Sequence, residues 1–343
     1  MVGPVSVKIS FMRSRASRYN RGRWLGCVTF SLLAASALCL GAADRFSADK
    51  TCAQLGYERI DLRRSGQNRL FLFGKLEGRK ESILVDTGWS LTTISPDAAG
   101  KLRTHQRPEP QPRNPLSATN EPSPAVVLSS LNLDRVVFTN QPAHVQEMTF
   151  GGQRAPFEIV LGCDFLIRNF AVIDCAHRRL YTRPLPPLAE QQAELENRMR
   201  QGGFVSVDLR RRNPLALTCP ARLNGETVEL LVDTGAVWSC LDADLATRLG
   251  LKLLPTPRQI TGAGATGRRG FTVTQANSVE LGSTEMGRLN FAALHLGDWG
   301  LAAPGAALAD VGGILGGPEL ANWRTVIDCH GLKLWFKPPS ARR

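Results

Sequence analysis

Two copies of one sequence unit make up most of this 343-residue chain. The matched blocks keep a constant offset of 147 residues: 60–64 with 207–211, 76–78 with 223–225, and 83–88 with 230–235. Each copy then closes on an apolar-Leu-Gly block and a Val-Ile-Asp-Cys block, at 160–162 and 172–175 in the first copy and at 314–316 and 326–329 in the second. Because chance does not produce such blocks in the same order twice, the sequence predicts two lobes of one fold.

The copies are rich in short runs of β-forming residues. Runs such as 70–73 and 204–207 are bounded by Gly, Asn and Pro, which is typical of strands. One helix is expected after each Asp-Thr-Gly block, most clearly at 242–249, with Gly250 ending it. Prolines at 184–187 and a polar helix from Ala189 to Arg200, ended by two glycines, separate the copies. We therefore predict a mainly β protein with these parts: an N-terminal lobe at 52–183, a linker at 184–203 and a C-terminal lobe at 204–339.

The first 43 residues differ from the rest. They contain six basic residues and no acidic ones, and residues 25–43 are uncharged and end in small residues before Asp44. A basic N-terminal stretch, an apolar run and small residues at the end of that run indicate an export signal. The run is also close to the ~20 residues that cross a bilayer, so an uncleaved membrane anchor through 25–43 is the alternative. We expect an exported protein, periplasmic or secreted, and membrane-anchored if the signal stays attached.

Half of the net charge of +12 lies in this segment. The other 300 residues hold 36 basic and 30 acidic residues, an ordinary solvated surface, so no nucleic-acid partner is expected. Six cysteines lie beyond the signal and can form disulfides in an oxidising compartment, with 15 possible pairings: Cys52, Cys163, Cys175, Cys219, Cys240 and Cys329. There is no Cys-x-x-Cys pair and the histidines are scattered singly, so no metal or organic cofactor is expected.

The Asp-Thr-Gly blocks place an aspartate at the end of each of two strands that are expected to be buried. Apolar tripeptides at 83–85 and 230–232 lead directly into Asp86 and Asp233, and burying a carboxylate is costly unless other groups compensate. Thr87 and Thr234 offer hydroxyls, and Gly88 and Gly235 allow close backbone approach because they lack a Cβ. If the two loops meet, carboxylates ~3 Å apart cannot both ionise and share one proton. Such a pair can activate a water molecule and protonate a carbonyl.

These blocks resemble those of the retropepsin-like aspartic proteases of the bacterial exported type. The resemblance rests on apolar-apolar-Asp-Thr-Gly and on the later apolar-Leu-Gly and Ile-Asp blocks, and it covers roughly 56–183 and 204–339. It implies retropepsin-like β-barrel lobes in tandem, a monomer whose two halves form a pepsin-like pseudo-dimer. Asp86 and Asp233 would then be the catalytic pair, and Thr87 and Thr234 the interlocking hydroxyls beneath it.

A glycine-rich segment in the second copy resembles the flap of this family. Gly262, Ala263 and Gly264 begin a Gly-x-Gly-x-x-Gly sequence that strand-like residues follow, whereas a dinucleotide loop requires a helix there. The resemblance implies a hairpin that folds over bound peptide, and a plain surface hairpin is the alternative. The first copy has no counterpart, since 107–124 is proline-rich.

The residue after Asp-Thr-Gly differs between the copies. Ala236 fits the family pattern, but Trp89 is very large for a position that lines the substrate cleft. The indole fills a subsite and enforces small substrate side chains, blocks the dyad, or packs peripherally.

The sequence therefore predicts an aspartic endopeptidase that acts on a peptide or protein substrate. One alternative is a catalytically silent peptide-binding protein of the same fold, with Trp89 occluding the cleft. Another is pairing of lobes between two chains instead of within one.

Overall fold

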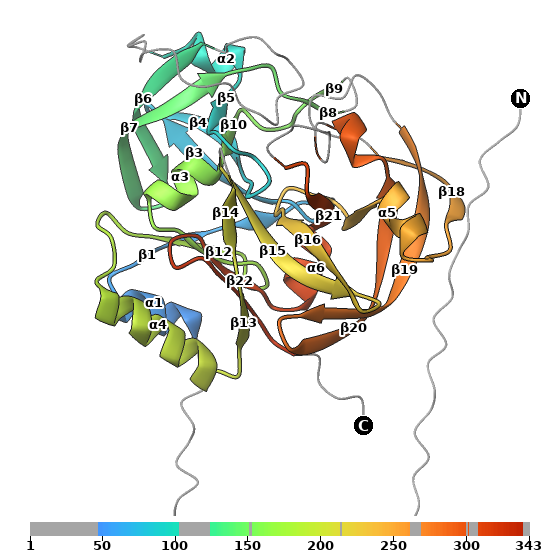
Figure 1. The fold of residues 1–343 in the computed structure, drawn as a ribbon. Helices are drawn as coiled ribbons and strands as arrows, with labels where there is room; N and C mark the ends of the chain where they lie inside the picture. Colours follow the sequence, from blue (N-terminus) through green and yellow to red (C-terminus); the bar gives the residue numbers. More distant parts are fainter. Residues whose placement is uncertain are drawn as a thin grey trace, which may run out of the picture. The chain divides into compact units, whose positions relative to one another are not determined.

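A computed structural model describes residues 47–102, 124–150, 153–212, 215–260, 269–299, 301 and 308–338. All of them belong to one unit, Arg45–Arg343. Strands dominate this unit and, in the described residues, form three large sheets and a two-stranded hairpin (Figure 1). The predicted mainly β, two-lobed acid protease fold is confirmed. The signal or anchor predicted at 1–43 lies outside the described residues.

The N-terminal lobe is a seven-stranded sheet closed on itself. Its strands are, in sheet order, β2 (Arg63–Arg64), β3 (Leu70–Leu76), β4 (Arg79–Val85), β10 (Ile159–Leu161), β5 (Thr93–Ile94), β7 (Val136–Val145) and β6 (Ala125–Leu133). The sheet closes because β3 pairs with β6 as well as with β4. Leu70, Leu72 and Leu76 alternate along β3 with more exposed residues, so every second side chain enters the core.

The C-terminal lobe repeats this design with eight strands. In sheet order they are β14 (Arg210–Arg212), β15 (Ala216–Leu223), β16 (Glu226–Val232), β21 (Val311–Leu315), β17 (Cys240–Asp242), β20 (Thr284–Leu294), β19 (Arg269–Leu281) and β18 (Leu254–Ile260). Here β15 pairs with β19 and closes the sheet. Among the described strands, β18 has no counterpart in the first lobe.

A third sheet joins the lobes. Its order is β1 (Glu58–Asp61), β12 (Arg179–Thr182), β11 (Val172–Asp174), β22 (Val326–Asp328), β23 (Lys333–Phe336) and β13 (Val205–Asp208). The two Val-Ile-Asp blocks form its central pair, in which Ile173 lies opposite Ile327. The register of this pair is symmetric, so the pseudo-twofold axis that relates the two copies passes through it. Asp174 and Asp328 are buried at the strand ends, where they accept hydrogen bonds from the backbone N–H groups of the following turns.

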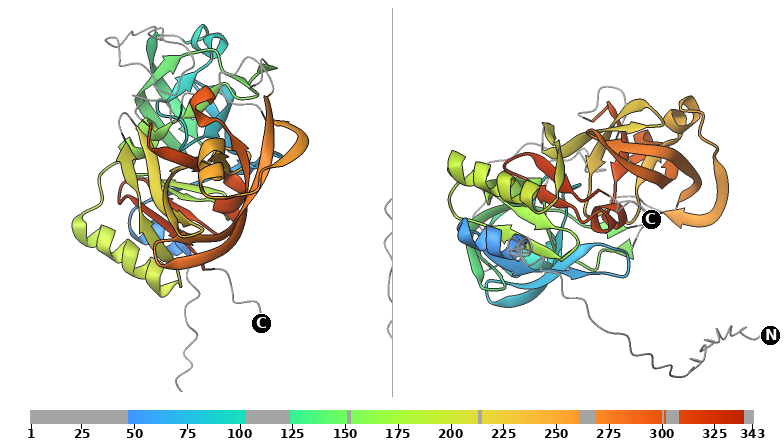
Figure 2. Two further views of the ribbon diagram at one scale, coloured as in Figure 1. Left: turned by 45° about the vertical axis from the view of Figure 1, so that its right-hand side comes forward. Right: turned by 90° about the horizontal axis from the view of Figure 1, so that it is seen from below.

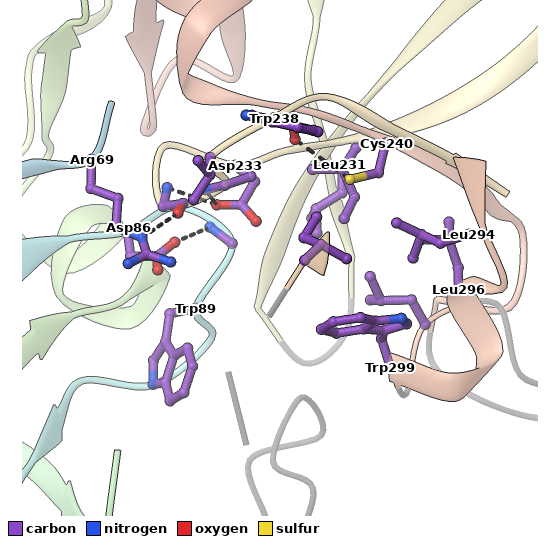
Figure 3. Close-up of a pocket in the computed structure, with 17 residues that line it drawn as sticks. Arg69, Asp86, Trp89, Leu231, Asp233, Trp238, Cys240, Leu294, Leu296 and Trp299 are labelled. Atoms are coloured by element: carbon purple, nitrogen blue, oxygen red, sulfur yellow. Dashed lines mark hydrogen bonds between the residues drawn. The ribbon is translucent and has the colours of Figure 1, made fainter. Parts of the chain in front are cut away.

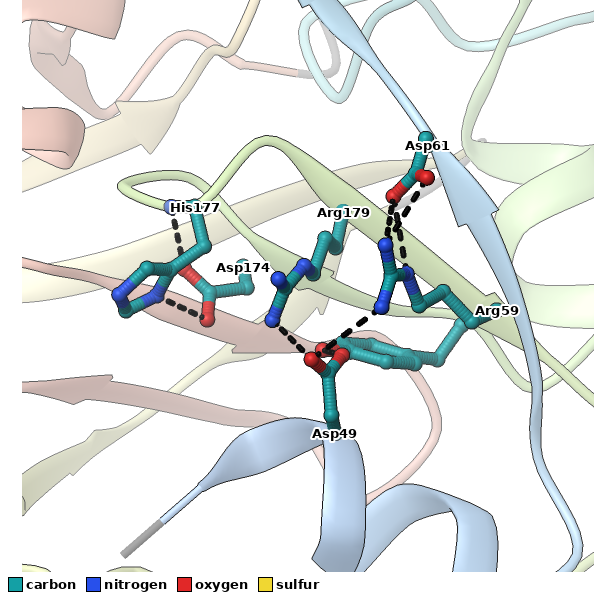
Figure 4. Close-up of polar contacts among 7 residues, drawn as sticks. Asp49, Arg59, Asp61, Asp174, His177 and Arg179 are labelled. Atoms are coloured by element: carbon teal, nitrogen blue, oxygen red, sulfur yellow. Dashed lines mark hydrogen bonds and ion pairs between the residues drawn. The ribbon is translucent and has the colours of Figure 1, made fainter.

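Two helices cover the joining sheet. α1 (Ala48–Gln54) and α4 (Ala189–Gln201) contact each other, and Leu195 and Met199 of α4 pack in one cluster with Trp335 of the sheet (Figure 2). Asp49 attaches α1 to strand β12 through a 2.6 Å hydrogen bond from the Tyr181 hydroxyl and an ion pair with Arg179 (Figure 4). The predicted linker helix is thus present and forms part of the folded core.

Short elements complete the lobes. They are α2 (Pro96–Ala99), α3 (Cys163–Arg168), α5 (Ala243–Arg248), α6 (Gly317–Asn322), the 3₁₀ turn η1 (Leu296–Trp299) and the hairpin of β8 (Thr149–Phe150) with β9 (Gln153–Arg154). The helix predicted at 242–249 is α5. Asp242 caps its first turn, and Gly250, at φ +66°, follows its end. Within the described ranges, no helix has both the length and the apolar character needed to span a membrane.

The six cysteines of the described chain form no disulfides and are all buried. Burial raises the pKa of each of these thiols, to about 12 for Cys219 and Cys240. The disulfides that the sequence allowed are therefore absent from these positions. Cys163, Cys175, Cys219 and Cys329 lie in the main core cluster, Cys52 and Cys240 lie in two others, and all six act as small apolar groups.

Candidate active site

Strands β4 and β16 deliver the two aspartates to one place. β4 ends at Val85 and pairs in parallel with β10, so the Asp86 N–H donates to the Leu161 carbonyl at 3.1 Å. β16 and β21 repeat this arrangement, and the Asp233 N–H donates to the Leu315 carbonyl at 3.0 Å. The duplicated Leu-Gly blocks therefore support the loops that carry the aspartates.

The two Asp-Thr-Gly loops meet face to face. A Cβ on Gly88 would collide with the Asp233 carboxylate, and a Cβ on Gly235 would collide with the Asp86 carboxylate. Each glycine thus leaves room for the aspartate of the other lobe, and the structure brings Asp86 and Asp233 together as the sequence predicted.

The threonines interlock beneath the aspartates. The Thr87 N–H donates to the Thr234 hydroxyl at 3.1 Å, and the Thr234 N–H donates to the Thr87 hydroxyl at 3.0 Å. Each hydroxyl also donates to a strand-end carbonyl of the opposite lobe, Thr87 to Val232 at 2.7 Å and Thr234 to Val85 at 2.8 Å. Both threonines are buried, so these four bonds fix the loops relative to each other.

The two carboxylates receive unequal support from the backbone (Figure 3). Asp86 accepts one N–H, from Gly88 at 2.9 Å. Asp233 accepts two, from Gly235 at 2.7 Å and from Ala236 at 2.8 Å. Backbone N–H groups favour the ionised carboxylate, so Asp233 is the better-stabilised anion.

The pKa shifts follow the same asymmetry. Burial, the charge of Asp233 and a hydrogen bond between the two carboxyl groups hold the pKa of Asp86 well above its usual range. Burial also raises the pKa of Asp233, but the hydrogen bond from Asp86 and the two backbone N–H groups oppose this rise. Both shifts oppose ionisation of the two carboxyl groups together, and they oppose it more at Asp86 than at Asp233.

Arg69 lies beside the pair and was missed by the sequence analysis. Its side chain is 6% exposed and its Nε donates to the Gly235 carbonyl of the other lobe at 3.0 Å. Its charge lowers the pKa of both Asp86 and Asp233, and burial lowers the pKa of Arg69 itself. The matching residue of the second copy is Ala216, so a comparison of the copies for unmatched charges would have found it.

A cavity of about 150 Å³ lies against both aspartates, and its described walls come mostly from the C-terminal lobe. They are apolar except for Arg69 and the aspartates: Gly88, Trp89, Leu231, Gly235, Ala236, Val237, Trp238, Cys240, Ile260, Leu294, Leu296, Trp299, Leu301 and Ile314. These apolar walls favour the binding of an apolar side chain next to the carboxylates.

Trp89 does not separate the cavity from the aspartates. Its side chain is 7% exposed and packs with Leu84 and Val160, and its Nε1 donates to the Thr93 hydroxyl at 2.8 Å. Figure 3 shows the ring apart from Leu294, Leu296 and Trp299, on the N-terminal side of the site. Ala236, at the matching position, lines the open cavity.

The glycine-rich flap residues Gly262, Ala263 and Gly264 lie outside the described residues. The strands on either side of them, β18 and β19, pair antiparallel up to Ile260 opposite Arg269. Ile260 lines the cavity, so the described base of this hairpin lies at the site. Among the residues that the structure describes, no group of three or more His, Cys, Asp or Glu side chains is placed to hold a metal ion.

Comparisons with known proteins give matches in both lobes. A family model described as gag-polyprotein putative aspartyl protease matches residues 219–299, and one described as aspartyl protease matches residues 73–165. No curated protein sequence matches the chain.

Three solved structures are similar at low identity. The aspartic proteinase from Irpex lacteus has 12% identity and a TM-score of 0.47, covering 83% of this chain and 98% of its own. Basic 7S globulin from soybean has 11% identity and a TM-score of 0.46, covering 82% and 95%. A retropepsin-like aspartic protease from Rickettsia conorii has 20% identity and a TM-score of 0.26, covering 37% and 89%.

The family matches fall on the duplicated unit. Each matched range contains one Asp-Thr-Gly block, and the two ranges together span about half of the chain. The chain therefore belongs to the retropepsin-like family of aspartic proteases and is a peptidase.

Proposed function

We propose that the protein is an endopeptidase in which Asp86 and Asp233 of a single chain activate water. The observation that carries the proposal is the reciprocal fit of each Asp-Thr-Gly glycine against the aspartate of the other lobe. It puts two carboxylates in one buried site beside an apolar cavity, where they can share a proton.

The unequal support of the carboxylates suggests their roles. Asp233, the ionised member, takes a proton from a water molecule while the water oxygen bonds to the carbon of the peptide carbonyl. Asp86 gives its proton to the carbonyl oxygen, which leaves a tetrahedral diol. When the C–N bond breaks, the nitrogen takes the proton from Asp233 and Asp86 recovers its own from a hydroxyl. Each proton is then accounted for and the pair returns to its starting state.

Arg69 and the threonines would position this pair. The hydrogen bond from Arg69 to the Gly235 carbonyl attaches the Asp-Thr-Gly loop of the C-terminal lobe to the N-terminal lobe. The buried hydrogen bonds between the threonines fix both Asp-Thr-Gly loops beneath the aspartates. A preorganised site of this kind lowers the cost of aligning the water and both carboxylates.

Cleavage of a diverse peptide pool between pH 3 and 8 tests the proposal. We expect the wild type to cleave and both Asp86→Asn and Asp233→Asn to lose cleavage while remaining folded. An equimolar mixture of the two variants separates pairing within a chain from pairing between chains, since only the latter restores activity. A wild type that binds peptides without cutting them would favour the silent peptide-binding alternative.

We also propose that the protein acts outside the cytoplasm, because residues 1–43 have the charge and hydropathy pattern of an export signal. Cell fractionation with and without residues 1–43 tests this. Retention of the full chain in the cytoplasm would exclude it.

A further inference from the structure

We propose that this protease takes a large apolar substrate side chain on one side of the cleaved bond and only a small one at the matching position on the other side. The inference rests on the proposed function. It comes from comparing the open cavity with the same region of the N-terminal lobe, which the indole of Trp89 fills.

Four positions define the open cavity in the C-terminal lobe. Leu231 comes from the strand that precedes Asp233, Ala236 and Cys240 follow the Asp-Thr-Gly block, and Ile314 comes from the supporting strand β21. The methyl group of Ala236 is the smallest of these side chains, so the space in front of it stays open.

Trp89 is the counterpart of Ala236, and the counterparts of the other three residues enclose it. By the repeat, Leu231 corresponds to Leu84, Cys240 to Thr93 and Ile314 to Val160. Leu84 and Val160 belong to the cluster that holds the indole, and Thr93 accepts its N–H at 2.8 Å.

Further contacts close the filled side. Met148, Ala155 and Phe157 pack in the same cluster as Trp89 and are themselves buried. Since the indole N–H is also satisfied by Thr93, moving the ring out of this position would cost both packing and a buried hydrogen bond. The ring is therefore a fixed wall, and a substrate does not displace it.

The chemistry of the open cavity specifies its occupant. Trp238, Leu294 and Trp299 line it together with the residues above, and its only described charged groups are Arg69 and the aspartate pair. An apolar side chain of the size of Leu, Met or Phe gains the most from such a surface. Because the pseudo-twofold axis relates the two regions, the restricted position lies equally far from the cleaved bond on its other side.

Mass spectrometry of products from a peptide library that varies three residues on each side of the cleaved bond tests the inference. For the wild type we expect large apolar residues enriched at one position and Gly, Ala or Ser at its mirror position. Equal acceptance of large residues at both positions would overturn the inference while leaving the proposed function intact. No cleavage of any peptide would overturn both.

Substitutions at the two matched positions sharpen this test. Trp89→Ala should raise cleavage of peptides with a large apolar residue at the restricted position by roughly tenfold, with kcat/KM as the readout. Trp89→Leu keeps part of the packing and should show a smaller gain if Trp89→Ala does not fold. Ala236→Phe should lower cleavage of peptides that place a large residue in the open cavity.

Trp323→Leu is the matched control, since this half-buried tryptophan ends helix α6 and does not line the cavity. It should leave the pattern of accepted residues unchanged. A folded Trp89 variant with the same pattern as the wild type would overturn the inference.

Discussion

Thr87 and Thr234 each accept the backbone N–H of the other, at 3.1 and 3.0 Å, across the boundary between the two lobes. Each hydroxyl also donates to a carbonyl of the opposite lobe. Thr87→Val and Thr234→Val keep the shape of the side chain but leave a buried N–H and a buried carbonyl without partners. We expect each variant to lose about 1–3 kcal/mol in the free energy of unfolding, measured by urea denaturation.

The conservative variants Thr87→Ser and Thr234→Ser retain the hydroxyl and should restore most of this loss. The double Val variant should cost less than the two single costs added together, because both hydroxyls belong to one network. Single Val variants as stable as the wild type would show that the interlock contributes nothing.

Gly88 and Gly235 provide the second prediction. A Cβ at either position would collide with the aspartate of the other lobe, so Gly88→Ala and Gly235→Ala should push the carboxylates out of alignment. Misplacement by ~1 Å costs on the order of a hundredfold in rate, which peptide cleavage assays would detect in kcat/KM. Gly66→Ala is the control, since a Cβ there meets no atom within 4 Å and the rate should stay at the wild-type level.

Repetition explains how much of the site could be predicted from the sequence. Asp86, Thr87 and Gly88 recur as a block that follows the same apolar tripeptide, so a symmetric pair of Asp-Thr-Gly loops could be predicted. Whether the pair forms within one chain or between two did not follow from the repeat, and the structure has it within one chain. The Val-Ile-Asp-Cys blocks were also visible, but that Ile173 would pair with Ile327 in one joining sheet depends on how the lobes dock.

Features that break the repeat were harder to predict. Arg69 has Ala216 as its counterpart, and no periodicity in a single strand shows that its side chain turns toward the site. The size of Trp89 alone left three interpretations open, because the neighbours that hold its ring, Met148 and Phe157, lie far along the chain. The number of cysteines allowed disulfides, but which cysteines lie close enough to pair depends on the folded structure.

The buried cysteines give the third prediction. All six described thiols are enclosed in the core and their pKa values are raised by burial, so they react poorly in the native protein. A chromogenic thiol assay at pH 8 should detect six more thiols after unfolding in urea than before it, with no reductant present. Reductant should leave the Tm unchanged. A fall in Tm on reduction would contradict the absence of disulfides.

The charge of Arg69 contributes to the pKa values of the aspartate pair. Its positive charge favours the ionised form of both Asp86 and Asp233 and lowers the pKa of each. The active form holds one proton, so its acid limit is set by loss of the first proton from the pair and its alkaline limit by loss of the second. Removing the charge makes both losses harder, and the two limits should move to higher pH.

Arg69→Gln is therefore expected to shift the whole profile of kcat/KM upward in pH. Arg69→Lys keeps the charge and should retain most of the wild-type profile, even if the lost bond to Gly235 lowers the rate. The other titratable side chains whose charges couple to the pair, Cys163 and Cys240, stay neutral thiols because burial raises their pKa. A profile for Arg69→Gln that falls in rate without moving in pH would show that Arg69 acts through structure alone.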